Sequence, residues 1–356
     1  MNLILAINPG STSTKIAVYQ NEKEIFIKNI KHTTEELAGF SIITDQYEFR
    51  KQIILEELKA NNLDVNAMKT IVGRGGLVKP IASGIYAVNE PMKADLRKGV
   101  LGQHASNLGG LIADDIAKSV DGAKAYIADP VVVDEMEDIA RISGHPEFER
   151  ISIFHALNQK AIARTHAKKQ GKKYEDINLI VAHLGGGISV GAHKKGRVID
   201  VNNALDGEGP FSPERAGTLP VGQLAKLCFS GKYELAEIKK MITGKGGFVA
   251  YLDTNDAYVV EQAAENGDKK AMLIQDAMAY QVAKEIGALS CVLEGEVDGI
   301  ILTGGIAYGK PFVEAVKKRV KHLGNFFVYP GEDEMKALAM NGLMVLKGEI
   351  VASEYH

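Results

Sequence analysis

The residues best suited to chemistry gather in one short turn near the start of the chain. An apolar strand pattern over Asn2–Ile7 is followed by Asn8–Lys15, whose sequence is Asn-Pro-Gly-Ser-Thr-Ser-Thr-Lys. A second strand pattern covers residues 16–19, and the Pro-Gly pair predicts a tight bend between the two strands. Small residues at such a bend allow backbone N–H groups, hydroxyls and a lysine to converge on one anion, which suits a phosphate. A polar hairpin that binds nothing is the alternative.

The same pattern recurs about half a chain later. A strand pattern beginning at Asn178 leads into Gly185-Gly186-Gly187 and then into a further β-like run that ends at Val201. A third strand pattern, residues 299–303, stops on a glycine pair. Self-similarity at half the chain length predicts two domains of one design. We expect the two glycine-rich hairpins to bind a nucleotide's phosphates from both sides. The residues that match in register are Asn2/Asn178, Leu3/Leu179, Ile4/Ile180, Ala6/Ala182 and Gly10/Gly186.

The composition is that of an ordinary globular protein. The 356 residues are 46% hydrophobic and 24% charged, and a net charge of −3 with a pI near 6.3 gives no electrostatic footprint for nucleic acid. No apolar run approaches about 18 residues and no basic leader precedes the first strand, so we expect a cytoplasmic protein without a membrane partner. Cys228 and Cys291 lie in apolar helical patterns, and we expect buried thiols rather than a disulfide or a metal cluster.

Strand and helix patterns alternate along the rest of the chain. The irregular stretch 202–220 is rich in proline and glycine, and a loop of this length inside a compact domain usually has a function. We expect one domain over residues 1–154, joined by a C-terminal helix over 341–356, and a second domain over 155–340. The main patterns are strands at 70–72, 125–128 and 151–154, and helices at 35–58, 91–101, 105–119, 156–169 and over most of 221–293.

Two common nucleotide-binding motifs are incomplete. The glycine turn at residues 185–187 is followed by Val190 where a dinucleotide fingerprint has glycine or alanine, and it leads into a strand rather than a helix. Residues 304–310 have the spacing of a P-loop, but Pro311 stands where that loop needs a hydroxyl for magnesium. Neither motif therefore accounts for the glycine-rich turns.

Taken together, the turns resemble those of the acetate kinase family, a branch of the actin-like ATPase superfamily. The segments that carry this resemblance are Asn8–Lys15, His183–Ser189 and Thr303–Ile306. Further segments resemble the members of the family that act on butyrate, and the resemblance covers essentially the whole chain. These segments are Val72–Leu77, Gln103–Gly109, Ile153–Lys160 and Tyr329–Met335.

The resemblance implies a fold and a reaction. The implied fold is α/β, with two actin-like (ribonuclease H-like) domains of mixed β-sheets flanked by helices around a nucleotide cleft. The implied reaction is reversible: ATP and a short-chain carboxylate, butyrate, give ADP and butanoyl phosphate with Mg²⁺ as cofactor. A carboxylate is already ionised near neutral pH, so such chemistry needs positioning and charge stabilisation more than a strong base. The resemblance also implies a homo-oligomer, at least a dimer.

Single residues receive roles from the same resemblance. It implies that Arg74 binds the substrate carboxylate, that Arg215 neutralises the transferring phosphoryl group and that His155 donates to its oxygens. Asp129 matches an aspartate near the reacting groups. The residues themselves leave alternatives: a surface turn for Arg74, a local ion pair between Glu214 and Arg215, a helix cap or packing role for His155, and a capped turn for Asp129.

The resemblance also implies nucleotide and metal contacts. For magnesium it implies Asn8 and Glu334, with Glu332 as the alternative carboxylate, although acidic residues also favour a helix N-terminus without any ligand. His183 has the same packing alternative as the other histidine. The residues implied for the nucleotide are Asn8, Gly10, Ser11, Thr12, Ser13, Lys15, His183, Gly185, Gly186, Gly187, Gly304 and Gly305.

Two departures from the family pattern leave the substrate open. Acetate kinases carry a histidine before the arginine and another just after it, whereas Gly73 and Gly75 flank Arg74. Their F-D-T-x-F-H segment is replaced by Ala128–Val133, whose valine run is compatible with a longer acyl chain. A branched-chain or propionate kinase is therefore the nearest alternative. A non-catalytic actin-like ATP switch, which would not need Arg74, is the alternative outside enzymes.

Overall fold

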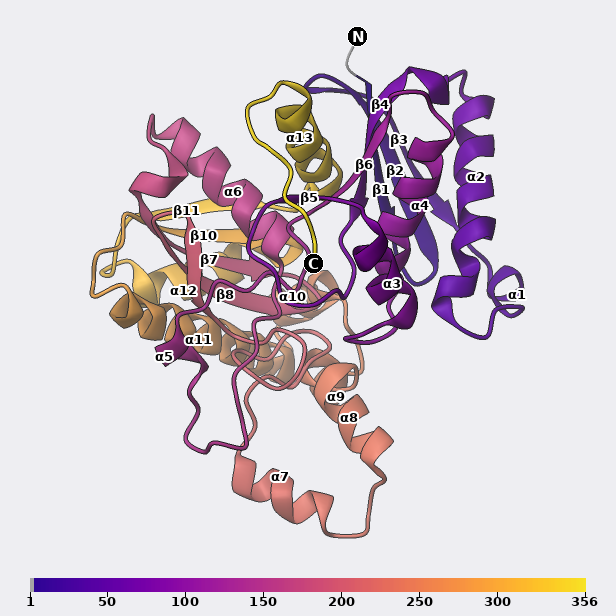
Figure 1. Ribbon diagram of the computed structural model, residues 1–356. Coiled ribbons are helices and arrows are strands. Elements are labelled where there is room, and N and C mark those ends of the chain that lie inside the picture. Colours follow the sequence, from indigo (N-terminus) through magenta and orange to yellow (C-terminus); the bar gives the residue numbers. More distant parts are fainter. Residues whose placement is uncertain (1–2) are drawn as a thin grey trace. The chain divides into compact units, whose positions relative to one another are not determined.

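The computed structural model describes residues 3–356, which divide into two compact units (Figure 1). Unit 1 consists of Met1–Val133 and Asp333–His356, and unit 2 of Asp134–Glu332. The predicted start of the first strand at Asn2 lies outside the described residues. The domain bounds expected from the sequence stay a prediction, and each unit is described by itself below.

Unit 1 is built on a six-stranded mixed sheet with the order β3-β2-β1-β4-β6-β5. The first three strands form an antiparallel meander, and β4 and then β6 add to β1 in parallel. Parallel pairing brings the C-terminal ends of β1, β4 and β6 to the same end of the sheet. The strands are β1 (Leu3–Pro9), β2 (Ser13–Gln20), β3 (Lys23–Lys31), β4 (Met68–Arg74), β5 (Ile85–Ala87) and β6 (Lys124–Ala128).

Helices cover both faces of this sheet. Successive strand residues point to opposite faces, so Leu5 and Ile7 pack in one core with residues of α2 and α4. Ile4 and Val72 instead face α13, where Gly342 lies close to both side chains. The helices are α1 (Thr34–Leu37), α2 (Tyr47–Ala60), α3 (Glu90–Lys98), α4 (Asn107–Lys118) and α13 (Glu334–Leu346), with short 3₁₀ turns η1 (Ile43–Gln46) and η2 (Val65–Ala67).

Unit 2 repeats this design with five strands in the order β11-β10-β7-β8-β9. Strands β7 to β9 form an antiparallel meander, and β10 and then β11 add to β7 in parallel. The order and direction match β6-β4-β1-β2-β3 of unit 1, so the self-similarity of the sequence is a repeat of topology. The strands are β7 (Asn178–Leu184), β8 (Ile188–Lys194), β9 (Arg197–Val201), β10 (Gly299–Gly304) and β11 (Phe326–Pro330).

The sheet of unit 2 is also covered on both faces. Ala163 of α6 packs with Leu179 on one face, and Met278 of α11 packs with Ile180 on the other. Helix α12 lies against α11 (Figure 1). The helices are α5 (Asp138–Arg141), α6 (Ala156–Lys169), α7 (Val221–Cys228), α8 (Leu235–Thr243), α9 (Gly247–Leu252), α10 (Ala257–Glu265), α11 (Lys269–Val292) and α12 (Lys310–Val320), with 3₁₀ turns η3 (Tyr174–Asp176) and η4 (Gly305–Tyr308).

Two expectations from the sequence are wrong. Residues 151–154 form no strand, because their backbone bonds join no ladder: Ile153 O accepts from Ala204 N at 2.8 Å and Phe154 O from Ala156 N at 2.8 Å. Cys228 and Cys291 are exposed rather than buried. No residue of α7, which ends at Cys228, is buried, and Cys291 follows the buried Ser290 in α11. Among residues 3–356, no helix has the length and apolar character needed to cross a membrane.

The close approach of β4 and α4 provides a test of the fold. A Cβ on Gly109 of α4 would overlap the backbone oxygen of Arg74. We expect Gly109→Ala to destabilise the protein by about 1–3 kcal/mol, because backbone atoms must move to relieve the overlap. Gly287→Ala in α11 is the control, since a Cβ there meets nothing within 4 Å and should add up to about 1 kcal/mol of stability. Urea unfolding measures both, and equal stability of the two variants would contradict this packing.

Candidate active site

The hairpin that joins β1 and β2 holds five of the predicted nucleotide residues. Gly10 N donates to Ser13 O at 2.7 Å and closes the turn. Asn8 lies opposite Lys15 in the antiparallel pairing that leads into it. The residues at the tip are exposed, so their polar groups are accessible to a ligand. The five residues of this turn and its second strand are Gly10, Ser11, Thr12, Ser13 and Lys15.

Three side chains of unit 1 meet where β1 and β4 end. Asn8 and Arg74 occupy strand positions on the same face as Ile4 and Val72, which is the face that α13 covers. Glu334 is the first residue of α13. Asn8 Nδ2 donates to Glu334 Oε2 at 2.5 Å, and Arg74 Nη1 donates to Asn8 Oδ1 at 3.3 Å. Arg74 also contacts both carboxylate oxygens of Glu334 at 3.3 Å. We call this group the Asn8–Arg74–Glu334 cluster.

The chemistry of this cluster suits a carboxylate and a hard cation. The side chains of Arg74 and Glu334 are 27% and 19% exposed, so a ligand can reach them. A guanidinium binds a planar carboxylate with two parallel donors, and carboxylate and amide oxygens are ligands that Mg²⁺ prefers. No group of three His, Cys, Asp or Glu residues in the described chain is arranged to hold a metal. A magnesium ion here would therefore take few protein ligands and complete its shell with water or ligand oxygens, which is usual for this ion.

Asp129 follows β6 at the same end of the sheet. It is 2% exposed, and its Oδ1 accepts hydrogen bonds from Ser83 Oγ at 2.6 Å and from Gly84 N at 2.8 Å. Its φ of +37° lies in the left-handed region, which is unfavourable for a residue with a Cβ. These contacts fit a capped turn, and they fix the orientation of a buried carboxylate one residue beyond Ala128, the strand partner of Arg74.

In unit 2, the second glycine-rich turn lies against Arg215. Gly185 N donates to Gly187 O at 3.1 Å, and Ser212 Oγ donates to Gly186 O at 2.6 Å. The Arg215 guanidinium fills the space beside Gly187, where a Cβ would overlap it. The structure therefore brings together the predicted arginine and the predicted phosphate turn, which are far apart in the sequence.

The surroundings of Arg215 leave it available to an anion. Its Nη1 donates to Ala204 O, whereas its Nε is buried with no hydrogen-bond partner. Burial lowers the pKa of Arg215 and Glu214 partly opposes this effect, although Glu214 Oε1 accepts its hydrogen bond from Asn255. A buried donor without a partner is uncommon in folded proteins, and an anionic ligand would supply the missing acceptor.

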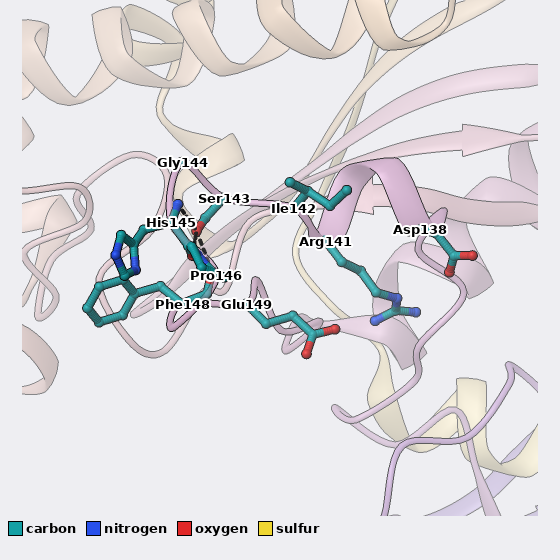
Figure 2. A pocket seen from close by; sticks show the side chains of 9 residues that line it. All are labelled: Asp138, Arg141, Ile142, Ser143, Gly144, His145, Pro146, Phe148 and Glu149. Atoms are coloured by element: carbon teal, nitrogen blue, oxygen red, sulfur yellow. Dashed lines mark hydrogen bonds between the residues drawn. The ribbon is translucent and has the colours of Figure 1, made fainter.

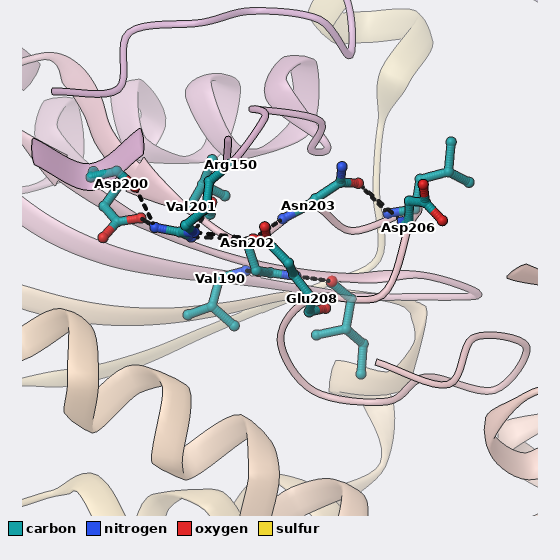
Figure 3. Close-up of polar contacts among 11 residues, drawn as sticks. Arg150, Val190, Asp200, Val201, Asn202, Asn203, Asp206 and Glu208 are labelled. Carbon is teal, nitrogen blue, oxygen red and sulfur yellow. Dashed lines mark hydrogen bonds and ion pairs between the residues drawn. The ribbon is translucent and has the colours of Figure 1, made fainter. Parts of the chain in front are cut away.

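An ion-pair network holds the start of the loop that carries Arg215 (Figure 3). Arg150 pairs with Asp200 at 2.9 Å and with Glu208 at 3.2 Å. The side chain of Asn202 accepts a hydrogen bond from Val190 N at 2.8 Å and so binds the loop to β8. These contacts explain how an irregular segment can present an arginine in one position.

A buried chain of hydrogen bonds on the α6 side of the sheet ends at His155. Tyr174 OH and Gln159 Oε1 contact the two ring nitrogens of His193 at 2.6 Å and 2.9 Å. Gln159 Nε2 donates to Ser189 O at 3.0 Å and to Ser189 Oγ at 2.8 Å. Ser189 Oγ in turn lies 2.8 Å from His155 Nδ1. We call these residues the His193–His155 chain.

The direction of this chain assigns a tautomer to His155. The Ser189 carbonyl can only accept, so Gln159 presents its NH₂ group there and its oxygen to His193 Nε2, which must donate. Ser189 Oγ accepts from Gln159 Nε2 and from the His155 backbone N–H at 3.4 Å, which uses both of its lone pairs. Its own hydrogen is then directed to His155 Nδ1. In its neutral form His155 therefore carries its ring proton on Nε2, where it acts as a donor.

His183 stacks on His155, with ring centroids 3.9 Å apart and planes inclined by 14°. Its Nδ1 contacts Asn158 Oδ1 at 2.8 Å, and its Nε2 lies 3.4 Å from Glu332 Oε2. The two carboxylates considered for magnesium thus have different neighbours: Glu332 accompanies His183 in unit 2, whereas Glu334 accompanies Asn8 in unit 1.

The last predicted glycines lie at the end of β10. Gly304 has a φ of +89°, and a Cβ on it would overlap Leu184 O, so only glycine fits. Gly305 lines a cavity of about 190 Å³ whose largely apolar and aromatic walls suit a flat heteroaromatic ring. Burial raises the pKa of Glu261 in this lining. The cavity is lined by Phe248, Ala257, Tyr258, Glu261, Gln275, Met278, Gly305, Ile306, Tyr308, Gly309 and Phe312.

Two larger cavities contain no predicted site residue. One of about 560 Å³ is formed by residues 138–149, with the side chains of Ile142 and Phe148 among those around it (Figure 2). Another of about 560 Å³ in unit 1 is lined by α4, β6 and the C-terminal residues. Cavity size alone therefore does not identify the site.

Comparisons with known proteins identify the family and the fold. The model of the acetokinase family matches residues 150–342. Butyrate kinase 1 of Clostridium acetobutylicum is 59% identical over 355 residues, covering 100% of both chains, and butyrate kinase 2 is 59% identical over 352 residues, covering 99% of both. The acetate kinase structure from Porphyromonas gingivalis matches with a TM-score of 0.80 at 18% identity, covering 97% of this chain and 100% of that one. The predicted α/β fold of two actin-like domains is thereby confirmed.

Reasoning from the sequence misses several residues around the predicted ones. Asn158 and Gln159 lie in a segment that carries the family resemblance, but nothing in their pattern indicates that they orient two histidines. Ser189 follows the glycine turn in a segment that also carries the resemblance, but its pattern does not indicate that it contacts His155. Arg50 of α2 offers none, because an arginine in a helical pattern is normally at the surface, yet it is 1% exposed.

The His193–His155 chain predicts a pH dependence of stability. Burial, reinforced by the charges of Lys160 and Arg164, lowers the pKa of His193 well below its usual value. The folded protein therefore excludes a proton that the unfolded chain binds below a pH of about 6.5. We expect the free energy of unfolding to fall as the pH drops below this value, by up to about 1.4 kcal/mol per pH unit from this one group.

His193→Gln isolates that contribution, because glutamine does not titrate and the other histidines remain in both proteins. Urea unfolding between pH 7.5 and pH 5.5 should give a shallower decline for the variant. An equal decline of the free energy of unfolding with pH in the wild type and in His193→Gln would contradict a neutral His193.

Proposed function

The chain belongs to the acetokinase family, and from this premise we propose that it is a butyrate kinase. It transfers the γ-phosphoryl group of ATP to a carboxylate oxygen of butyrate and gives ADP and butanoyl phosphate, in a reversible reaction. The observation that carries this proposal is the full-length identity to two butyrate kinases. The arginines, glycine turns and hard oxygen donors described above supply the chemistry that such a transfer needs.

In this proposal Arg74 binds the carboxylate of the substrate. The fork that it forms with the Glu334 carboxylate supports this role, because butyrate presents the same planar group. Butyrate is already ionised near neutral pH, so a positioned oxygen needs no general base to attack phosphorus. Asp129, held by Ser83 and Gly84, acts as an orienting carboxylate at the same end of the sheet.

Arg215, His155 and His183 serve the transferring phosphoryl group. Its charge spreads over three oxygens, and a well-placed arginine can accelerate such transfers by about 10³–10⁵. The partnerless Nε of Arg215 and its position beside Gly187 support this role. The donor tautomer assigned to His155 supports hydrogen bonding to an oxygen of the same group.

The glycine-rich turns bind the phosphates of the nucleotide through backbone donors. In unit 1 these are the residues of the first hairpin, and in unit 2 they are Gly185, Gly186 and Gly187 with Gly304. The cavity beside Gly305 takes the adenine ring. Its largely apolar walls and the polar side chains of Glu261 and Gln275 support this assignment.

Asn8 and Glu334 hold magnesium in this proposal. Asn8 Oδ1 and Glu334 Oε2 both accept from Arg74 Nη1 at 3.3 Å, and the Glu334 side chain is partly exposed. This arrangement fits an ion that keeps most of its shell as water or phosphate oxygen. Bound magnesium would neutralise charge on the phosphate oxygens. The proximity of Glu334 to Asn8 favours it over Glu332.

The acyl-chain length of the substrate, the cellular location and the oligomeric state belong to the same proposal. Val132 and Val133 are buried in unit 1 and Val131 is half-buried, and this apolar run is compatible with a longer acyl chain. We place the enzyme in the cytoplasm as a homo-oligomer, at least a dimer. Exposed large apolar side chains of unit 2 support self-association. They are Ile139, Ile142, Phe148, Val221, Phe229 and Leu235.

The choice of acid is tested by a hydroxylamine assay of acyl phosphate. Acetate, propionate, butyrate, isobutyrate and isovalerate are each supplied with ATP and Mg²⁺. We expect the highest kcat/KM for butyrate and a value for acetate lower by about tenfold or more, because acetate lacks two methylene groups. Preference for acetate would contradict the proposal, and preference for isobutyrate, isovalerate or propionate would establish the alternative substrate.

Substitution of Arg74 distinguishes a carboxylate kinase from a non-catalytic ATP switch. Arg74→Ala should lower kcat/KM for butyrate by about 10–100-fold, the value of a lost charged hydrogen-bond pair, while ADP binding measured by calorimetry persists. Arg97→Ala removes an exposed arginine from α3 of the same unit and should leave both unchanged. Unchanged turnover in Arg74→Ala would contradict this role of Arg74, and ADP binding without any butyrate turnover in the wild-type protein would favour the switch.

A further inference from the structure

A buried arginine lies behind the first phosphate turn. Arg50 of α2 is 1% exposed, and both terminal nitrogens of its guanidinium donate to the hairpin that joins β1 and β2. Nη1 donates to Gly10 O at 2.8 Å and to Ser13 O at 2.9 Å, and Nη2 donates to Ser11 O at 3.1 Å. The remaining contacts are to Thr14 Oγ1 at 3.1 Å and to Gln46 Oε1 at 3.1 Å and 2.7 Å.

These contacts fix which side of the turn faces a ligand. The fourth carbonyl of the turn, Thr12 O, accepts from His32 N at 2.9 Å, so all four oxygens from Gly10 to Ser13 are bonded within the protein. In a trans peptide the C=O and the next N–H point in opposite directions. Because Gly10 O and Ser11 O point at Arg50, the N–H groups of Ser11 and Thr12 point away from it.

The charge of Arg50 is not balanced by a carboxylate among its contacts. All six contacts are to neutral oxygens. Burial lowers the pKa of Arg50 to about 10, which leaves the group positive at neutral pH. The nearby His32 contacts Thr14 Oγ1, and burial together with the charge of Arg50 lowers its pKa, so it adds no second charge at neutral pH.

We infer that Arg50 is a positioning residue for the nucleotide's phosphates. It holds three of the four carbonyl dipoles of the turn inward, those of Gly10, Ser11 and Ser13, so that amide donors face the anion, and it places a positive charge behind them. A buried cation without a counter-ion is costly, and a polyphosphate bound at the turn offsets that cost. This inference rests on the proposed function for its ligand, a nucleoside di- or triphosphate, but not on which acid is phosphorylated.

A merely structural role for Arg50 would have different effects on stability and on ligand binding. Arg50 also connects α2 to the hairpin, and its loss would then lower stability without changing the preference for a phosphorylated ligand. The comparison of ADP with adenosine separates the two roles, because adenosine lacks the phosphates that the turn would bind.

The experiment measures dissociation constants of ADP with Mg²⁺ and of adenosine by calorimetry, on variants whose folding is verified by circular dichroism. We expect Arg50→Met to weaken ADP binding by about tenfold or more, the value of lost charged hydrogen bonds, and to leave adenosine binding within twofold. Arg50→Lys keeps the charge but has three donors, and should weaken ADP binding at least threefold. Lys51→Met, the next residue of α2, is the control and should change neither constant.

Each outcome decides the inference. Unchanged ADP binding in folded Arg50→Met overturns it, and so does equal weakening of ADP and adenosine. If Arg50→Met does not fold but Arg50→Lys does, an unchanged dissociation constant of Arg50→Lys for ADP overturns the inference. If the wild-type protein binds ADP but phosphorylates an acid other than butyrate, the proposed substrate fails while the role of Arg50 is still decided by these measurements.

Discussion

The structure depends on one electrostatic constraint: a chain with a net charge of −3 must bind a polyphosphate and a carboxylate, which are both anions. Overall charge cannot attract them, so attraction has to be local. Unit 1 supplies a hairpin whose carbonyls are bonded away from its exposed tip, and an arginine at the end of β4. Unit 2 supplies a glycine turn against which a partly unsatisfied Arg215 packs.

Strand geometry explains how these groups reach their positions. In each unit a hairpin is followed by parallel strands that end at the same end of the sheet. Alternation along β1 and β4 places Asn8 and Arg74 on the face that α13 covers, where Glu334 begins the helix. The same alternation in β7 and β8 places His183 and Ser189 on the α6 face, where they contact Asn158 and Gln159. One repeated topology therefore builds two sets of polar groups with different chemistry.

Much of the fold is predictable from the sequence because its signals are local. Apolar strands that stop on glycines, and helices over 91–101, 105–119 and 156–169, correspond to elements of the structure. What the sequence does not predict depends on tertiary contacts: the burial of Arg50, the direction of the His193–His155 chain, and the support of Arg215 by Arg150 and Asn202. The largely apolar segment 151–154 misleads for the same reason, since a strand needs a neighbouring strand and none within residues 3–356 pairs with it. Roles of single site residues stay predictions that rest on their placement.

The central claim is direct transfer of the γ-phosphoryl group of ATP to a carboxylate oxygen. Butyrate labelled with ¹⁸O in both carboxyl positions tests it most directly, with ³¹P nuclear magnetic resonance of the products formed with ATP and Mg²⁺. The account predicts butanoyl phosphate whose phosphorus carries one ¹⁸O, in the bridge to the acyl carbon, because the carboxylate oxygen attacks phosphorus. Unlabelled inorganic phosphate released from ATP, with no acyl phosphate formed, would contradict it.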